Sequence, residues 1–265
     1  MRGKPSLRWL LNARERSNGM METMNGLYVD RVHLEGQLPE DSYLIQIPAI
    51  AQLEREDLEL KKKVTFFIGE NGTGKSTLIE AIAVACGFNP EGGSKNFNFS
   101  TNDSHSDLYR QLTIVRSAHP RDGFFLRAES FYNVATSIDE LGVNKSYGGE
   151  SLHGQSHGES FLTLVKQRFR GHGLYILDEP EAALSPNRLM QLLVRIHDLE
   201  KDSQFLIVTH SPILMSYPGA DLFLLDEKGM HKTDYRETES YRITKAFLDR
   251  PESMYRYLFE EDETE

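Results

Sequence analysis

The sequence is short of cysteine and of long apolar runs. One of its 265 residues is a cysteine, Cys86, which excludes an intrachain disulfide and a thiolate metal cluster. Cys86 falls in an apolar helical stretch, so we expect it to be a small core residue. No segment reaches the roughly 18 consecutive apolar residues that a membrane-spanning helix needs. We therefore expect a cytoplasmic protein without membrane insertion.

Basic residues are also in deficit. Lysine and arginine number 30 against 40 aspartates and glutamates, which gives a formal net charge of −10. Proteins whose main task is to grip nucleic acid usually carry a basic surface. The charge balance therefore does not indicate nucleic acid as a partner, although it leaves a local basic patch open. The length suits one substantial α/β domain or two small ones.

The two ends of the chain differ in charge. Basic residues gather in 1–25, where the apolar patch Leu7–Leu11 is too short for a signal peptide. We expect 1–25 to be a flexible tail or to precede the true start codon, and a basic targeting or partner helix stays open. Acids gather in 259–265, which we expect to be a solvated acidic tail. A single domain is predicted between them, over 26–258.

Short apolar runs alternate with helical periodicity inside that domain. Ser185 before Pro186 predicts a hydroxyl cap on one helix, and 88–110 is typical of a loop within a lid and helical region of about 88–172. The alternation predicts an α/β fold with a mainly parallel sheet flanked by helices, and ligands at the carboxyl ends of the strands. Strands are predicted at 64–68, 112–116, 124–127, 174–177, 205–209 and 222–225, and helices at 75–86, 158–170 and 187–199. One or two closing helices are predicted over 239–260.

The strongest motif joins the predicted strand 64–68 to the helix 75–86. The sequence GENGTGKST over 69–77 matches G-x-x-x-x-G-K-[ST], the phosphate loop of P-loop NTPases, in the required strand–loop–helix context. Its glycines let backbone amides point at phosphate oxygens, and the helix start adds its positive dipole end. We predict that Lys75 reaches the β- and γ-phosphates of ATP and that Ser76 ligates Mg²⁺. The predicted nucleotide contacts are Gly69, Glu70, Asn71, Gly72, Thr73, Gly74, Lys75, Ser76 and Thr77.

Two acids, Asp178 and Glu179, follow the predicted strand 174–177. Because side chains alternate along a strand, we expect them to point in different directions. Asp178 is predicted to hold the Mg²⁺ shell, and Glu179 to orient the water that attacks the γ-phosphate. His210 ends the next predicted strand, where it can hydrogen-bond the γ-phosphate. Glu179, His210 and Lys75 form the predicted catalytic set.

The order of these elements resembles the heads of ABC-type ATPases over about 27–230. A signature-like segment, Ser156-His-Gly-Glu-Ser160, and a D-loop-like segment, Ala183-Leu-Ser185, stand in the family's order with the phosphate loop, Asp178–Glu179 and His210. Ser156 and Glu159 also have the spacing of a helix capping box. The string FLRAESF over 125–131 is similar to stand-alone prokaryotic predicted ATPases, often labelled AAA, which lie near the ATPase heads of recombination and chromosome-maintenance proteins.

The resemblance implies a mechanism based on two subunits. It implies one ABC-type head with a small helical lid, and an ATP-dependent homodimer in which two heads sandwich two ATP molecules. Ser156 and Gly158 of one subunit would contact the γ-phosphate held by the other. ATP favours the closed pair because it contacts that state more than the open monomers.

The sequence departs from the family at two positions. His157 stands where transporter subunits usually carry glycine, and no Q-loop glutamine is evident. The matching strand end offers Glu129, our candidate for a metal- or water-linked group. Transporter subunits use the Q-loop to couple to their membrane partner, so its absence counts against that role. No coiled-coil insertion separates Lys75 from Asp178, which excludes the long-armed architecture of DNA-bridging ATPases.

The favoured hypothesis is Mg-dependent ATP hydrolysis that drives or gates a separate effector protein, in DNA processing or defence. The alternatives are the nucleotide-binding subunit of an ABC transporter and a nucleotide sensor without catalysis. Several smaller assignments stay open. They are adenine stacking by Tyr43, Phe97, Phe99 or Tyr109, a metal pair of His153 and His157, and Arg127 as a phosphate partner or a structural ion pair.

Overall fold

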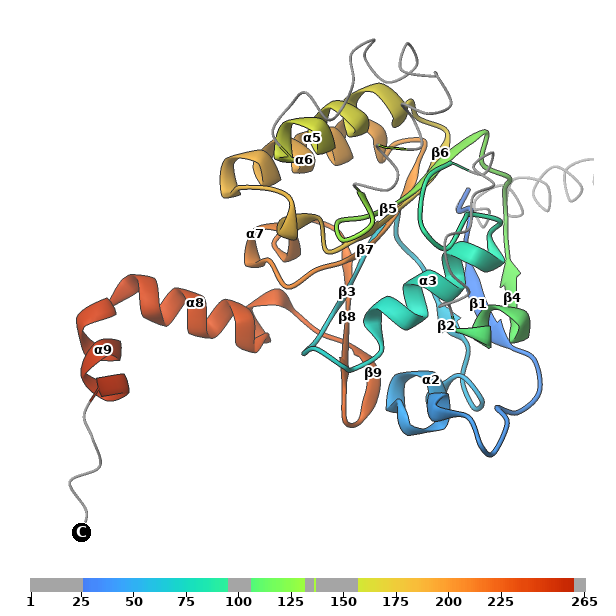
Figure 1. The fold of residues 1–265 in the computed structure, drawn as a ribbon, viewed down its shortest axis with the longest axis horizontal. Helices are drawn as coiled ribbons and strands as arrows, with labels where there is room; N and C mark the ends of the chain where they lie inside the picture. The colour runs from blue at the N-terminus through green and yellow to red at the C-terminus, as the bar shows by residue number, and fades with distance from the viewer. Residues whose placement is uncertain (1–25, 95–105, 132–135, 137–156, 260–265) are drawn as a thin grey trace, which may run out of the picture.

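A six-stranded sheet organises the part of the chain that the computed structural model describes, residues 26–94, 106–131, 136 and 157–259 (Figure 1). The strand order is β5-β6-β7-β3-β8-β9, and all neighbours are parallel except the hairpin β8–β9. The bounds are β3 Val64–Ile68, β5 Asp122–Arg127, β6 Gly173–Asp178, β7 Gln204–Val208, β8 Asp221–Asp226 and β9 Gly229–Lys232. The predicted mainly parallel sheet is confirmed, and its carboxyl ends bring the loops after β3, β5, β6 and β7 to one edge.

A second, three-stranded antiparallel sheet was not predicted. It has the order β2-β1-β4, with β1 Arg31–Leu34, β2 Leu58–Glu59 and β4 Leu112–Val115. The strand predicted at 112–116 therefore exists but belongs to this small sheet. Val32 and Leu34 of β1 are buried while Arg31 and His33 are exposed, a pattern too short to stand out in the sequence.

Helices cover the large sheet on both faces (Figure 1). On one face, α3 Lys75–Ala85 packs with α2 Pro48–Gln52 and the small sheet around Phe67, Ile79 and Ile176. Cys86 is buried in this core, as predicted. On the other face, α5 His157–Arg168, α6 Pro186–Leu199 and α7 Pro212–Met215 pack around Phe66, Phe161 and Phe205. Successive side chains of β3 point to opposite faces of the sheet, so Phe66 packs into one core and Phe67 into the other.

The start of α6 corrects one expectation. Ser185 is the N-cap residue and Pro186 takes the first helical position, both as predicted. The Ser185 hydroxyl, however, makes no capping hydrogen bond, so the proposed hydroxyl cap is wrong. The backbone carbonyl of Ser185 instead accepts the N–H of Leu189, over 2.9 Å.

The last two helices form an arm that leaves the body of the protein (Figure 1). They are α8 Glu239–Asp249 and α9 Pro251–Phe259. Two helices were expected here as an alternative to one, but α8 has no buried residue, so they do not close over the sheet. Pro251 starts α9 because it cannot continue α8. Within the described ranges, no helix combines the length and apolar character that crossing a bilayer requires.

Short 3-10 turns link these elements. They are η1 Tyr43–Gln46, η2 Asp107–Gln111, η5 Pro180–Ala182 and η6 Tyr235–Glu237. The turn η2 lies in the stretch predicted as a loop. Three predicted segments lie partly or wholly outside the described residues. They are the tail 1–25, the acidic tail at 260–265, and the lid at 95–105, 132–135 and 137–156.

Candidate functional site

The loop after β3 has a shape that only glycine permits at two positions. Gly69 has a φ of +142°, and a Cβ there would lie 2.2 Å from the carbonyl oxygen of Leu225. Gly74 has a φ of +91°, and its Cβ would lie 2.4 Å from Ile47. Gly74 also caps α3 without a side chain, so no side-chain cap competes for the amides of the first helical turn. Those amides are suited to an anion.

Lys75 lies inside this loop. The residue is 4% exposed, and its Nζ donates to the backbone carbonyl of Glu70 over 2.6 Å. Burial lowers the pKa of the Lys75 ammonium, while the carboxylates of Glu179 and Asp178 act in the opposite direction. The amino group of Lys75 thus lies within the loop, close to two acids from β6 and the turn after it.

Asp178 meets Ser76 across the site. The Ser76 hydroxyl donates to Oδ1 of Asp178 over 3.2 Å, although 102 residues separate them. Asp178 ends β6 and is 5% exposed. Burial raises the pKa of its carboxyl to about 6, nearby Arg127 opposes that rise, and Glu179 adds to it. The two side chains predicted to hold magnesium are thus adjacent.

Glu179 points where it does for a different reason than predicted. Strand β6 ends at Asp178, and Glu179 has a left-handed backbone with a φ of 50°. Its direction therefore follows from this turn, which its N–H fixes by donating to the carbonyl of Val208 over 3.0 Å, and not from strand alternation. Oε1 of Glu179 lies 3.4 Å from Nε2 of His210, so the structure brings these two predicted catalytic residues together.

Glu181 and Ser240 position His210, and neither was predicted from the sequence. Glu181 accepts the N–H of His210, and also the hydroxyl of Thr209 over 2.8 Å. Ser240, at the start of α8, donates to the carbonyl of His210 over 2.8 Å. The backbone of His210 is thereby held on both sides. The second acid of the sequence Asp-Glu-Pro-Glu over 178–181 was the available signal for Glu181.

Arg127 joins three carboxylates at the end of β5. Its Nη1 lies 2.6 Å from Glu80, its Nη2 2.8 Å from Glu129, and its Nε 3.4 Å from Oδ2 of Asp178. The sequence left open whether Arg127 is a phosphate partner or part of a structural ion pair, and the structure shows the ion pairs. Glu80 was missed, although it follows Ser76 by one turn on α3. The side chain of Glu129 is 76% exposed, on the outer side of Arg127.

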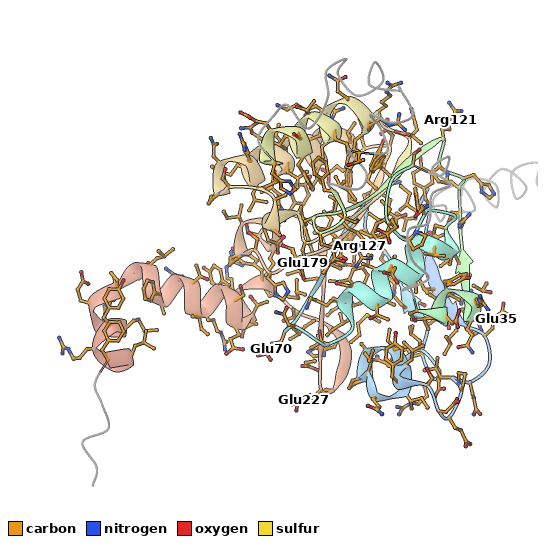
Figure 2. The ribbon with its side chains drawn as sticks, viewed as in Figure 1. Glu35, Glu70, Arg121, Arg127, Glu179 and Glu227 are labelled. Carbon is orange, nitrogen blue, oxygen red and sulfur yellow. The ribbon has the colours of Figure 1, made fainter. Side chains whose placement is uncertain are left out.

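Two cavities flank the phosphate loop. The smaller, about 240 Å³, opens beside Arg127 and Glu179, which lie close together at the centre of the molecule (Figure 2). Its lining is Ser76, Arg127, Ala128, Glu129, Asp178, Glu179 and Ala182. The larger, about 640 Å³, lies between the loop, His210, β8 and the start of α8.

The donor set around Ser76 suits magnesium with a phosphate ligand. Within the described ranges, no cluster of three or more histidine, cysteine, aspartate or glutamate side chains could hold a metal alone. Magnesium is usually bound by one or two protein oxygens together with substrate phosphates. The hydroxyl of Ser76 and the carboxylate of Asp178 fit that pattern. Of the suggested histidine pair, His157 packs edge-on against Phe131, and His153 lies outside the described residues.

The remaining predicted residues are placed as follows. Gly158 is buried at the start of α5, where a Cβ would lie 2.8 Å from the carbonyl of Ala183 in the D-loop-like segment. It does not line either cavity beside the phosphate loop of its own chain. Tyr43 is 56% exposed in η1, and Tyr109 lies in η2. Ser156, Phe97 and Phe99 lie outside the described residues.

Two family models match separate parts of the chain. One, described as an AAA domain, covers residues 45–137. The other, described as an AAA domain, putative AbiEii toxin, Type IV TA system, covers 160–216. The first match contains the phosphate loop and Arg127, and the second contains Asp178, Glu179 and His210.

Several proteins are similar to this chain. An uncharacterized ABC transporter ATP-binding protein of Haemophilus influenzae is 23% identical over 75% of this chain and 84% of its own length. The ABC transporter ATP-binding protein ModF of Escherichia coli is 30% identical over 54% of this chain and 34% of its own. The chain also spans 35% of a xylose import ATP-binding protein, XylG, of Moorella thermoacetica, at 24% identity over 58% of this chain. It thus covers about a third of the length of two of these three relatives.

Solved structures are similar as well. CbiO1 of Clostridium perfringens, part of an ABC transporter complex, aligns at a TM-score of 0.48 and 17% identity over 88% of this chain and all of its own. The SMC head domain of Thermotoga maritima aligns at a TM-score of 0.43 and 16% identity over 78% of this chain and 99% of its own.

Proposed function

We propose that this chain, a P-loop ATPase of the ABC type, works as an ATP-dependent homodimer whose Mg-dependent ATP hydrolysis drives or gates a separate effector protein. The observation that carries the proposal is the contact between Ser76 and Asp178, with Lys75 buried beside it. It joins the two halves of a phosphate and metal site across 102 residues of chain. We further propose one ATPase domain over 26–258 with its lid at about 88–172.

Binding uses the loop 69–77. The backbone amides of the loop and of the first turn of α3 surround the phosphates, and Thr77 contacts a phosphate oxygen. Lys75 exchanges its hydrogen bond with the Glu70 carbonyl for oxygens of the β- and γ-phosphates, which bear more negative charge. Ser76 and Asp178 would hold the magnesium ion, with Glu129 as a further candidate. The bound ion would neutralise negative charge on the phosphate oxygens.

Hydrolysis uses Glu179 and His210. Glu179 accepts a proton from a water molecule as that oxygen attacks the γ-phosphorus, and the bond to the β–γ bridging oxygen breaks to leave ADP and phosphate. Nε2 of His210 is buried and makes no hydrogen bond to another described residue, so it can turn toward the γ-phosphate. Glu181 and Ser240 hold the backbone from which this ring projects.

The dimer places the start of α5 over the phosphate loop of a second copy. Gly158 packs against Ala183 of its own chain and lines neither cavity beside its own phosphate loop, which supports a role for Gly158 in trans. The resemblance to ABC-type heads extends that proposed role to Ser156. A separate effector protein would receive the motion that ATP binding and hydrolysis drive in this dimer.

A test combines turnover with association. Phosphate release should be lost in Lys75→Ala and in Glu179→Gln, and retained in the matched surface change Glu40→Gln. Light scattering after gel filtration should show Glu179→Gln as a dimer with Mg-ATP and as a monomer without it. Monomers under both conditions would reject the sandwich, and phosphate release that persists in Lys75→Ala would reject catalysis at this loop.

A transporter subunit is the second candidate, favoured by relatives named as ABC transporter ATP-binding proteins. The described strand end after β5 offers Glu129 in place of a glutamine, which weighs against it. Purification of the tagged protein from detergent-solubilised membranes separates the two. Stoichiometric recovery of one integral membrane protein would favour the transporter, and recovery of a soluble partner with Glu179→Gln would favour the effector.

A further inference from the structure

Arg127 faces Asp178, the carboxylate proposed above to hold magnesium. It ends β5 directly opposite Asp178, which ends β6. Its strongest partner is Glu80 on α3, at 2.6 Å, and the two side chains are only 15% and 14% exposed. This pair is therefore shielded from water, unlike an ordinary surface ion pair. Arg127 is fixed in place at the wall of the cavity that Ser76 and Glu179 also line.

The two oxygens of Asp178 have different partners. Oδ1 accepts from the Ser76 hydroxyl at 3.2 Å, and Oδ2 faces Nε of Arg127 at 3.4 Å. That Nε is buried and makes no hydrogen bond to any other described residue, because its contact with Asp178 is not aligned for one. This N–H is therefore available to a phosphate oxygen that reaches this wall of the cavity, while Nη1 stays paired with Glu80.

The charges around the cavity are strongly unbalanced without Arg127. Carboxylates of Glu129, Asp178 and Glu179 line it, and Glu80 pairs with Arg127 at its wall. The ammonium of Lys75 lies near Asp178 and Glu179. Three of these carboxylates face different nitrogens of Arg127, and within the described residues no three acids are arranged to hold a metal. Without the guanidinium, their oxygens are the ligand type that divalent metals prefer. The guanidinium repels a metal ion at Asp178, and phosphate oxygens can offset that repulsion by supplying ligands.

We propose that Arg127 is a resident counter-ion that holds Asp178 in the nucleotide-free protein and keeps divalent metal from binding there until a nucleotide arrives. Arg127 acts through Asp178 and is thus a positioning residue. The inference rests on the proposed ATP site, and it specifies the order of ligand binding: metal enters with the nucleotide and not before it.

The test measures Mn²⁺ binding without nucleotide, with free Mn²⁺ followed by electron paramagnetic resonance. Wild type should bind weakly, and Arg127→Gln should bind at least about tenfold more tightly, since it removes a charge next to the metal. Arg127→Lys keeps a cation and should stay near wild type. The double change Arg127→Gln with Asp178→Asn should return to weak binding, which shows where the ion sits. A purely structural Arg127 would create no new metal site.

Two results would overturn the proposal: equal Mn²⁺ affinity in wild type and Arg127→Gln, or tight binding by nucleotide-free wild type. If Arg127→Gln does not fold, as a thermal melt would show, Arg127→Gln with Glu80→Gln removes the buried acid along with its partner. A smaller rise in Mn²⁺ affinity above wild type is expected there, because Asp178 is freed of its cation but one nearby carboxylate is lost. Because this measurement contains no ATP, its failure is distinct from absence of ATPase activity, which would reject the proposed function instead.

Discussion

The hydroxyl of Ser76, at the start of α3, donates to the carboxylate of Asp178, at the end of β6, over 3.2 Å. The phosphate loop and the acid pair reach each other because β3 and β6 are parallel strands of one sheet, separated only by β7. Both strands end at the same edge, so helix start and carboxylate meet there. The chemistry of the site depends on this contact.

Ser76→Ala should weaken Mg-dependent hydrolysis by about 10- to 100-fold, because it removes one oxygen ligand and leaves Asp178 without its hydroxyl partner. Steady-state phosphate release as a function of Mg²⁺ concentration measures the loss. Ser76→Thr keeps the hydroxyl and serves as the control. Equal Mg²⁺ dependence in wild type and Ser76→Ala would contradict the assignment of this ligand.

Glu179→Gln should lower kcat by about 10²- to 10⁴-fold, because an amide cannot accept the proton of the attacking water. ATP affinity should change little, since the substitution preserves shape and touches no phosphate contact proposed here. Single-turnover hydrolysis and fluorescent-nucleotide titration separate the two quantities. A parallel loss of affinity would point to misfolding of the turn at 179–182.

Asp178→Asn should stabilise the protein when neither nucleotide nor divalent cation is present. The folded state raises the pKa of Asp178 from 3.8 to about 6, so the charged form is disfavoured on folding. The stability that this group contributes is therefore complete below the unfolded pKa and is lost as pH rises through about 6. Thermal melts should show that Asp178→Asn raises the free energy of unfolding more at pH 7.5 than at pH 5, by on the order of 1–2 kcal/mol. A gain independent of pH would contradict this cause.

Gln204→Leu should destabilise the fold by about 2–4 kcal/mol. Gln204 is fully buried on β7; its Oε1 accepts the N–H groups of Tyr28 and Val29, and its Nε2 donates to the carbonyl of Val29, each over 2.8 Å. Leucine keeps the volume and leaves those backbone groups unpaired. Urea unfolding measures the loss, and Gln191→Leu on the exposed face of α6 is the matched control. A loss no larger than in the control would show that water replaces the side chain.

Much of the fold was predictable because its signals are local. Mainly apolar runs of four or five residues at 64–68, 174–177 and 205–209 are typical of buried strands, and each was confirmed within a residue or two. The glycines of the phosphate loop likewise predicted that a helix begins at Lys75, where α3 starts. The small antiparallel sheet was not predictable, because β1 is four residues long and its partners lie far along the chain.

The residues of the candidate site also fall into two groups, those that a sequence motif indicated and those that only contacts in the structure revealed. Lys75, Ser76, Asp178, Glu179 and His210 stand in motifs that their neighbours in sequence define, and the structure places them around one loop. Glu80 and Ser240 stand in no such motif, and Glu181 was overlooked although it follows the acid pair closely. Their importance follows from ion pairs and hydrogen bonds that join α3 to β5, the turn after β6 to the end of β7, and that end to α8.

The sequence by itself determined the phosphate loop, the strand–helix alternation and the acid pair, since backbone freedom and hydrophobic periodicity act over a few neighbouring residues. Only the tertiary structure decided that Arg127 lies among Glu80, Glu129 and Asp178, and that α8 and α9 extend away from the sheet. The physical reason is that an ion pair depends on distance in space. The sheet register that sets Arg127 opposite Asp178 is a product of the whole packed core.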